Sequence, residues 1–131
     1  MAFDRMDRID LHCHSTASDG RLMPAQLVER ASNAGLRALA LTDHDTTAGL
    51  PAFHEAGRKY GIETISGVEI SASYANGTMH MLGLFVDENN PGFREFLARL
   101  AEGRNIRNPK IVKKLNELGM AITMQEVEQE A

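Results

Sequence analysis

Short apolar blocks separated by polar turns begin the chain. Residues 8–13 and 36–41 each predict a strand, and the second block is apolar except for one arginine, as expected for a parallel strand buried on both faces. Between them, apolar side chains at helical spacing follow Pro24, which suits a first helical position, and stop at Gly35. This part of the sequence therefore predicts a strand, a helix and a second strand.

The alternation of helix and strand continues to the middle of the chain. A second helix is predicted at about residues 48–60, where Gly61 ends it. Three further strands are predicted at residues 62–68, 70–74 and 78–86. The Asn76-Gly77 pair between the last two is a strong signal for a tight hairpin turn. Glu69 is expected at the carboxyl end of the first of these three strands.

The rest of the sequence has a helical pattern. Apolar residues recur at helical spacing through residues 93–118, and Gly119 is predicted to end this helix. The Asn108-Pro109 pair is predicted to break or kink it, because proline cannot donate a backbone hydrogen bond. Thr123, followed three residues later by Glu126, has the pattern of a capping box for a last helix. The order of the elements predicts an α/β fold, either a sheet or part of a barrel.

Composition narrows the class of protein without assigning an activity. The 131 residues fit one small domain, and 43% of them are apolar, which is enough for a core. The 14 basic and 18 acidic residues give a net charge of −4, so bulk charge does not favour nucleic acid, although bound metals can supply a local positive field. Cys13 is the single cysteine. No apolar run has the ~20 residues that cross a membrane, and residues 1–7 lack the apolar core of a signal peptide. We expect a cytoplasmic protein without an internal disulfide bond.

Polar side chains follow three of the predicted strands. They are His12 and His14 after the first, His44 between two aspartates after the second, and Glu69 after the third. Active sites of parallel α/β folds lie at the carboxyl ends of strands, so these groups are expected to converge. His12 and His14 are two residues apart and point to the same face of a strand, where two imidazoles can clamp a metal. The aspartates that flank His44 are expected to raise its basicity and fix its tautomer.

Four other polar residues have a structural as well as a functional interpretation, and a fifth has a structural one alone. Asp19 in a polar loop is by itself a common turn residue, and His80 among apolar neighbours is by itself typical of a core histidine. His54 is expected at the surface or in helix packing. Arg104 and Arg107 either lie on a solvated helical face or form a clamp for phosphate, whose oxygens a guanidinium binds in pairs.

Five short motifs together resemble the polymerase-and-histidinol-phosphatase (PHP) family. They are residues 10–15, 17–20, 41–45 and 67–71, followed by His80 with the Leu82-Gly83 pair. The sequence is most similar to a bacterial branch of stand-alone phosphoesterases, which release phosphate from nucleoside 3′,5′-bisphosphates or trim short RNA or DNA from the 5′ end. The resemblance therefore implies a nucleotide or a short nucleic acid as the substrate, and no membrane partner.

The same resemblance implies a fold and a set of ligands. Residues 1–103 would form the N-terminal half of a distorted (β/α)7 barrel, and residues 104–131 the beginning of a helical inserted subdomain. Two or three divalent metal ions are implied, and mixed imidazole and carboxylate ligands suit Mn, Zn or Fe. The implied metal ligands are His12, His14, Asp19, His44, Glu69 and His80. Glu69 would bridge two ions, and Glu69 and His14 are the expected catalytic residues, since closely spaced metals activate a water for attack.

The sequence departs from the family in its last part. The family completes its metal shells with a further histidine and an Asp-X-His motif, and no histidine follows His80. We therefore expect a fragment whose half-barrel edges are exposed and prone to associate. Two alternatives stay open. One is an amidohydrolase-like metal hydrolase, although Lys59, in a predicted helix, is a poor candidate for its carboxylated lysine. The other is a PHP remnant that binds metal without catalysis.

Overall fold

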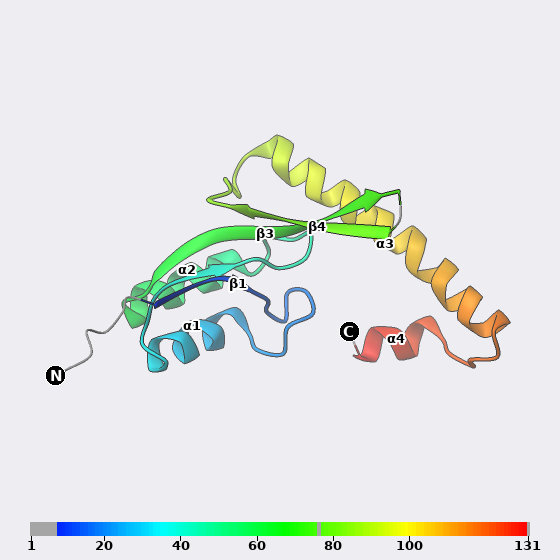
Figure 1. Cartoon of the computed structure of the whole chain (residues 1–131), viewed down its shortest axis with the longest axis horizontal. Coiled ribbons are helices and arrows are strands. Elements are labelled where there is room, and N and C mark those ends of the chain that lie inside the picture. Colours follow the sequence, from blue (N-terminus) through cyan, green and yellow to red (C-terminus); the bar gives the residue numbers. More distant parts are fainter. Residues whose placement is uncertain (1–7, 76, 131) are drawn as a thin grey trace.

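A four-stranded mixed sheet forms the centre of the fold, which a computed structural model describes for residues 8–75 and 77–130 (Figure 1). Its strands lie in the order β1 (Arg8–Cys13), β2 (Leu36–Leu41), β3 (Glu63–Tyr74) and β4 (Gly77–Leu84). The first three strands are parallel, and β4 runs antiparallel to β3. Each parallel connection carries a helix, as such crossovers usually do, which confirms the order of elements predicted for this part.

β3 is one long, curved strand (Figure 1). The sequence predicted two strands with a break at Glu69, and this prediction was wrong. Residues 63–66 pair with β2, whereas residues 67–74 pair with β4. Gly67 lies where the partner changes, and a Cβ there would come within 2.7 Å of the Leu41 carbonyl oxygen. The strand continues because a new partner takes over its backbone hydrogen bonds, which the local sequence does not reveal.

The change of partner sets the place of Glu69. It lies within β3, beyond Ser66, the last residue that pairs with β2, and so past the carboxyl end of the parallel sheet. At the far end of the hairpin, Tyr74 pairs with Gly77, while Asn76 of the predicted turn lies outside the described residues. Glu69 therefore lies at the carboxyl edge of the parallel strands, as expected, although β3 itself continues beyond it.

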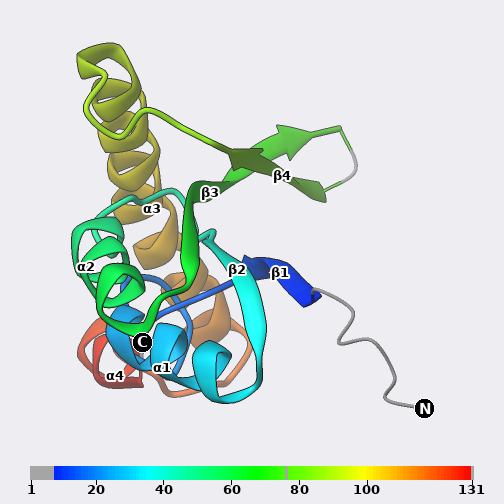
Figure 2. The ribbon, with the colours of Figure 1, turned by 90° about the vertical axis from the view of Figure 1, so that its left-hand side faces the viewer.

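Two helices cover the outer side of the curled sheet (Figure 2). α1 (Pro24–Asn33) begins at the predicted proline, and α2 (Leu50–Tyr60) begins two residues later than predicted and ends at Gly61, whose φ is +68°. Their apolar stripes pack together on β2 because helical spacing puts these side chains on one face. The buried residues of this core are Val28, Ala31, Leu39, Leu41, Leu50, Phe53, Ala56 and Ile62.

A smaller apolar cluster covers the opposite side of the sheet. It consists of Ala38, Ala40 and Ile65, with Leu11 and Leu84 packed against it. Residues 38–41 of β2 are all buried, so their side chains have apolar neighbours on both faces. This confirms β2 as a buried parallel strand and makes it the rigid element on which the polar loops at its carboxyl end are built.

A long helix follows the hairpin and runs past the carboxyl edge of the sheet (Figure 1). The sequence predicted a break or a kink at Pro109; α3 (Pro91–Glu117) continues through this proline, so a break there was wrong. Proline removes one helical hydrogen bond, but Asn105 and Pro109 are both exposed, so water can serve the carbonyl that loses its partner. Leu97 is buried, and with Ala98 it faces the loop that follows β2.

The last described element confirms the predicted capping box. Before α4 (Met124–Glu130), the Thr123 backbone N–H donates to a Glu126 carboxylate oxygen at 2.8 Å, and the Glu126 N–H donates to the Thr123 hydroxyl at 3.2 Å. Among the described helices, none combines the length and the apolar character needed to cross a membrane. The proposed boundary at Arg104 falls inside α3 and stays a prediction.

Candidate metal centre

Five histidine and glutamate side chains meet at the carboxyl edge of the parallel strands. His12 is in β1 and His14 directly follows it, whereas His80 lies in β4. His44 follows β2 and forms an isolated parallel bridge with Glu69 of β3. The bridge consists of two backbone hydrogen bonds, from Glu69 N–H to the residue before His44 and from the residue after it to Glu69. The backbone therefore holds His44 beside Glu69.

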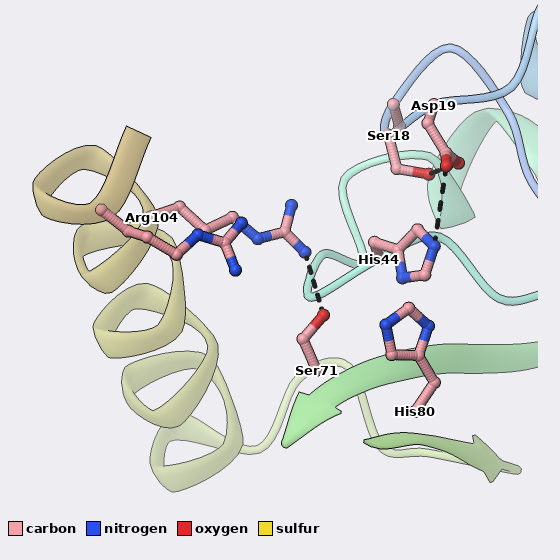
Figure 3. A pocket seen from close by; sticks show the side chains of 8 residues that line it. Ser18, Asp19, His44, Ser71, His80 and Arg104 are labelled. Carbon is pink, nitrogen blue, oxygen red and sulfur yellow. Dashed lines mark hydrogen bonds and ion pairs between the residues drawn. The ribbon is translucent and has the colours of Figure 1, made fainter. Parts of the chain in front are cut away.

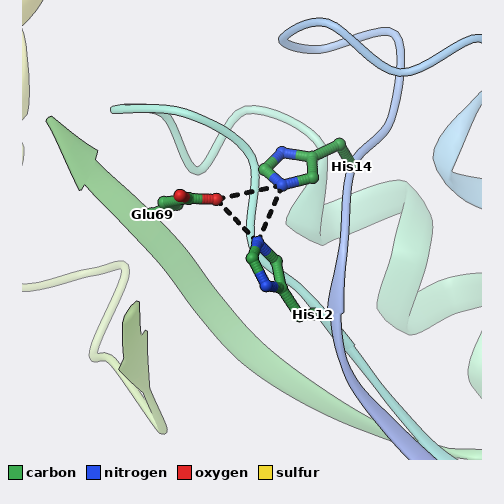
Figure 4. Close-up of side chains that lie close together, drawn as sticks. All are labelled: His12, His14 and Glu69. Carbon is green, nitrogen blue, oxygen red and sulfur yellow. Dashed lines mark hydrogen bonds and ion pairs between the residues drawn. The ribbon is translucent and has the colours of Figure 1, made fainter. Parts of the chain in front are cut away.

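His12, His14 and Glu69 converge on one point (Figure 4). The Glu69 Oε2 atom lies 2.7 Å from His12 Nε2 and 3.0 Å from His14 Nε2, and the two ring nitrogens are 3.1 Å apart. Metal bonds of about 2.1 Å place neighbouring ligand atoms ~3.0–3.4 Å apart; two of the three distances have this spacing, and the 2.7 Å between Glu69 and His12 is slightly shorter. The residues present therefore fit a divalent metal.

The second oxygen of Glu69 faces another histidine. Glu69 Oε1 lies 2.7 Å from His80 Nδ1, while Glu69 Oε2 lies 4.0 Å from His44 Nε2. The Glu69 side chain is 7% exposed. Burial opposes its ionisation, but hydrogen bonds from His12 and His80 and the nearby His44 outweigh burial and lower the pKa of the carboxyl below its ordinary value. A carboxylate with one oxygen toward each histidine group can bridge two cations.

Asp19 closes a third group with His14 and His44. Its two oxygens lie 3.5 Å from His14 Nδ1 and 3.6 Å from His44 Nε2, and its side chain is 67% exposed. The His14 and His44 rings stack with their centroids 4.7 Å apart. Both Nδ1 atoms are buried without a hydrogen-bond partner among the described residues. Each of these rings turns its Nε2 toward a carboxylate oxygen, at 3.0 Å from Glu69 for His14 and at 3.6 Å from Asp19 for His44, so Nε2 is the ring atom that a bound cation would meet.

The aspartates that flank His44 have other partners than predicted. We expected them to act on the His44 ring, but Asp43 accepts hydrogen bonds from the Ser15 N–H at 2.7 Å, the Ser15 hydroxyl at 2.6 Å and the Ser18 hydroxyl at 2.7 Å. Asp43 is 1% exposed. It thus fixes the loop that presents Asp19. A buried acid next to a serine-rich loop carries no local signal that names its partner, so the sequence did not reveal this role.

Asp45, on the other side of His44, binds a different part of the chain. Its carboxylate accepts from the Ser71 N–H at 2.7 Å and from the Arg104 guanidinium of α3. Burial raises the pKa of this carboxyl. The hydrogen bonds from Ser71 and Arg104, together with the charge of Arg104, lower the pKa by more than burial raises it, so the net shift is downward. The backbone φ of Asp45 is +53°, a region that aspartate tolerates better than most residues.

A pocket of about 410 Å³ lies between these groups and α3 (Figure 3). One wall carries Ser18, Asp19, His44 and His80, and the other carries Arg104 and Arg107; Ala17 and Ser71 also line the pocket. The structure therefore brings all eight predicted site residues to one region: six around the histidine cluster and two arginines across the pocket. Arg104 is not on a freely solvated helical face, because its guanidinium is bound to Asp45.

Three further residues with reactive or metal-binding side chains lie outside the site. The Cys13 thiol donates to the Ala40 carbonyl at 3.1 Å on the α1–α2 side, and burial, with the nearby acids, raises its pKa to about 12. The His54 ring is hydrogen-bonded to hydroxyls of β3 at 2.8 Å, which confirms helix packing. Lys59 lines a separate pocket between α1 and α2.

Fold and site together define an α/β protein with a histidine and carboxylate cluster suited to divalent metals. The PHP domain model matches residues 10–118, and the chain belongs to the PHP family. A 5′-3′ exoribonuclease of Haemophilus influenzae is 43% identical over 113 residues, which cover 86% of this chain and 41% of that protein. A 3′,5′-nucleoside bisphosphate phosphatase of Chromobacterium violaceum is 40% identical over 116 residues, 88% of this chain and 41% of that protein.

A solved structure shares the fold. A Bifidobacterium adolescentis protein assigned as a metal-dependent phosphoesterase superposes with a TM-score of 0.84 at 34% identity, covering 93% of this chain and 42% of that one. This likeness confirms the predicted part of an α/β barrel. The chain spans about two fifths of the length of the curated relatives described above.

Proposed function

We propose that the chain carries the metal-binding part of a phosphoesterase that acts on nucleoside 3′,5′-bisphosphates or short oligonucleotides. The observation that carries this proposal is the convergence of His12, His14 and Glu69 on one point beside a pocket whose far wall holds arginines. The names of the two curated relatives support it, since both describe cleavage of phosphate esters. The activity of the whole protein is part of the proposal.

We assign the first metal ion to His12, His14 and Glu69, and a second to Glu69 and His80. The distances of 2.7 Å from each Glu69 oxygen to a histidine nitrogen support a bridging role for this carboxylate. The lowered pKa of Glu69 supports it too, because the carboxylate is ionised at neutral pH and ready to bind a cation. Imidazole and carboxylate together suit Mn, Zn or Fe better than Mg, which prefers oxygen ligands alone.

We assign a third ion to Asp19 and His44, next to His14. The distance of 3.6 Å between Asp19 and His44 Nε2, and the close spacing of both side chains with His14, support this assignment. The site is open, because the Asp19 side chain is 67% exposed. A site with two assigned ligands and an exposed carboxylate should bind its ion more weakly than the group around Glu69.

The chemistry follows from the ligands. Divalent ions bound there would lower the pKa of an attacking water and offset charge on the phosphoryl oxygens. Glu69 and His14 are the proposed catalytic residues, since both would hold the ions that supply this chemistry: Glu69 would contribute both carboxylate oxygens, and His14 would contribute its Nε2 atom. Attack of water on the phosphorus of a bisphosphate's monoester breaks the ester P–O bond and releases an alcohol and inorganic phosphate. The same attack on a phosphodiester of an oligonucleotide releases an alcohol and a phosphomonoester, so a nucleotide leaves in place of inorganic phosphate.

The arginines give the proposed substrate a second anchor. Arg104 and Arg107 line the wall of the pocket that faces His44 and His80. A nucleotide with two phosphates can present one to the metal cluster and the other to these guanidinium groups, which bind phosphate oxygens in pairs. We therefore favour a bisphosphate or the end of an oligonucleotide over a nucleoside monophosphate.

Phosphate release tests this function. Adenosine 3′,5′-bisphosphate is incubated with the Mn-loaded chain and with a version extended through any coding sequence that follows Ala131. We expect release by the extended protein, and loss of at least 100-fold in its Glu69→Gln variant, since this removes a charged ligand. Glu55→Gln, an exposed change on α2, is the matched control and should leave the rate unchanged. No release by the metal-loaded extended protein would overturn the proposal.

The two alternatives make different predictions in the same assay. An amidohydrolase would cleave a C–N bond and leave the phosphoester intact, and the remote pocket of Lys59 gives it no support here. A PHP remnant without catalysis would bind Mn and release no phosphate in either version. Release of inorganic phosphate therefore separates the proposed function from both alternatives.

We also propose a cytoplasmic location and a helical subdomain from Arg104 onward.

We further propose that the chain associates through the edges of its sheet. The outer edge of β1 pairs with no strand among the described residues, and Ile9 on it is 54% exposed. At the other edge, Met81 of β4 is 54% exposed. Unpaired strand edges with apolar side chains favour pairing with further chain.

A further inference from the structure

Asp45 contacts three separate parts of the site. Its backbone N–H donates to the Glu69 carbonyl at 2.9 Å, and its side chain accepts from the Ser71 N–H and from Arg104. The side chain is 3% exposed. One buried carboxylate thus connects the loop of His44, the strand of Glu69, and α3, whose Arg104 lies 59 residues further along the chain.

The position of Asp45 ties it to the metal cluster without making it a ligand. It follows His44 directly, and Ser71, which it binds, pairs with His80 across the β3–β4 ladder. None of the possible metal-binding groups in the described part of the chain includes Asp45. Its carboxylate is directed to the other side, toward α3, where both of its oxygens have donors.

The two arginines of the pocket differ in how they are held. Arg104 is bound to Asp45 and lies 3.5 Å from the Ser71 hydroxyl, and its side chain is 32% exposed. Arg107, one turn further along α3, is exposed and has no ion pair within residues 8–75 and 77–130. An arginine that is fixed before the ligand arrives loses less conformational entropy on binding than a mobile one.

We infer that Asp45 is a positioning residue for substrate recognition. It holds Arg104 on the pocket wall opposite His44 and His80, and so favours substrates whose second phosphate reaches Arg104 when the first lies at the metal cluster. The inference rests on the proposed function. Asp45 acts through Arg104 and touches neither substrate nor metal. Its removal should therefore weaken binding of a bisphosphate while binding of a monophosphate and of metal stay the same.

Calorimetric binding to the Mn-loaded chain tests this inference, with adenosine 3′,5′-bisphosphate and adenosine 5′-monophosphate as ligands. Asp45→Asn keeps the left-handed backbone preference and an acceptor for the Ser71 N–H, but loses the charge that holds Arg104. We expect about tenfold weaker binding of the bisphosphate, less than about twofold change for the monophosphate, and unchanged Mn content. Arg99→Gln, which removes an exposed cation from the same helix, is the control and should change neither affinity.

A double variant separates positioning from a general structural role. If Asp45 acts through Arg104, Asp45→Asn should have no further effect on bisphosphate affinity once Arg104→Gln is present. Equal weakening of both ligands, additive effects of the two substitutions, or bisphosphate affinity that is unchanged or tighter in Asp45→Asn would overturn the inference. If the wild-type Mn-loaded chain bound neither nucleotide, the proposed function would fail first, and the inference with it.

Discussion

Single buried residues position the loops of the candidate centre. Asp43 is buried, and the three hydrogen bonds that it accepts from Ser15 and Ser18 fix the loop that carries Asp19. In the same loop, the Gly20 N–H donates to the Ser15 carbonyl at 2.9 Å, which folds the loop back on the residue after His14. Residues outside the candidate metal-binding groups therefore fix the positions of the side chains within those groups.

Gly20→Ala should disturb the centre through packing alone. A Cβ at this position would lie 2.2 Å from the His14 carbonyl oxygen, which is backbone and cannot rotate away. We expect a loss of about 1–3 kcal/mol in the free energy of unfolding, measured by urea denaturation, together with weaker Mn binding. Gly103→Ala is the matched control: nothing lies within 4 Å of its Cβ, and alanine should stabilise α3 by about 0.5–1 kcal/mol. Equal stability of the two variants would contradict the close contact at Gly20.

Local signals predicted most elements, and contacts distant in sequence explain the exceptions. Pro24, Gly61 and the capping box at Thr123 act within one turn of a helix, so the sequence shows them directly. The continuity of β3 depends on a second partner strand, which no local pattern encodes. The same holds for the site: strand order made the meeting of His12 with Glu69 predictable, whereas the ion pair of Asp45 with Arg104 depends on how α3 lies.

Pro109→Ala should strengthen the second half of α3. The helix is continuous through this exposed proline, which lacks the N–H that a helix interior uses. Alanine restores one hydrogen bond and avoids a cost of about 3 kcal/mol for proline in a helix interior. We expect slower amide hydrogen exchange across residues 105–113, measured by NMR, and unchanged exchange in α1. Unchanged or faster exchange in that segment would show that the helix already ends at Pro109.

The cap of α4 should depend on pH. Hydrogen bonds from the Thr123 hydroxyl and N–H lower the pKa of the Glu126 carboxyl, so its ionised form is favoured in the folded helix. A lowered pKa means that the stabilisation is complete above the ordinary glutamate pKa of about 4.3 and is lost as the pH falls through the lower folded value. The Thr123 amide shift should therefore titrate with a midpoint below the ordinary value. Glu126→Gln should abolish this titration; a midpoint at or above the ordinary value would rule the cap out.

At the scale of the whole molecule, one edge of the sheet collects the chemistry of five separate segments. β1, the loops after β1 and β2, β3 and β4 each contribute a side chain around Glu69, and α3 adds arginines across the pocket. Binding of a cation by the folded chain alone stabilises it, by about 2.7 kcal/mol when the free metal exceeds the dissociation constant a hundredfold. A metal held by Glu69 and its histidine neighbours would therefore link metal binding to the stability of the fold.

Metal content tests the central claim most directly. The chain is dialysed against Mn, freed of loosely held ions and measured by elemental analysis, beside Glu69→Gln and the exposed control Glu55→Gln. We predict about two or three Mn ions per chain for the wild type and the control, and loss of most of this metal in Glu69→Gln. A wild-type chain without bound Mn, or a Glu69→Gln variant that binds as much as the wild type, would contradict the account of this site.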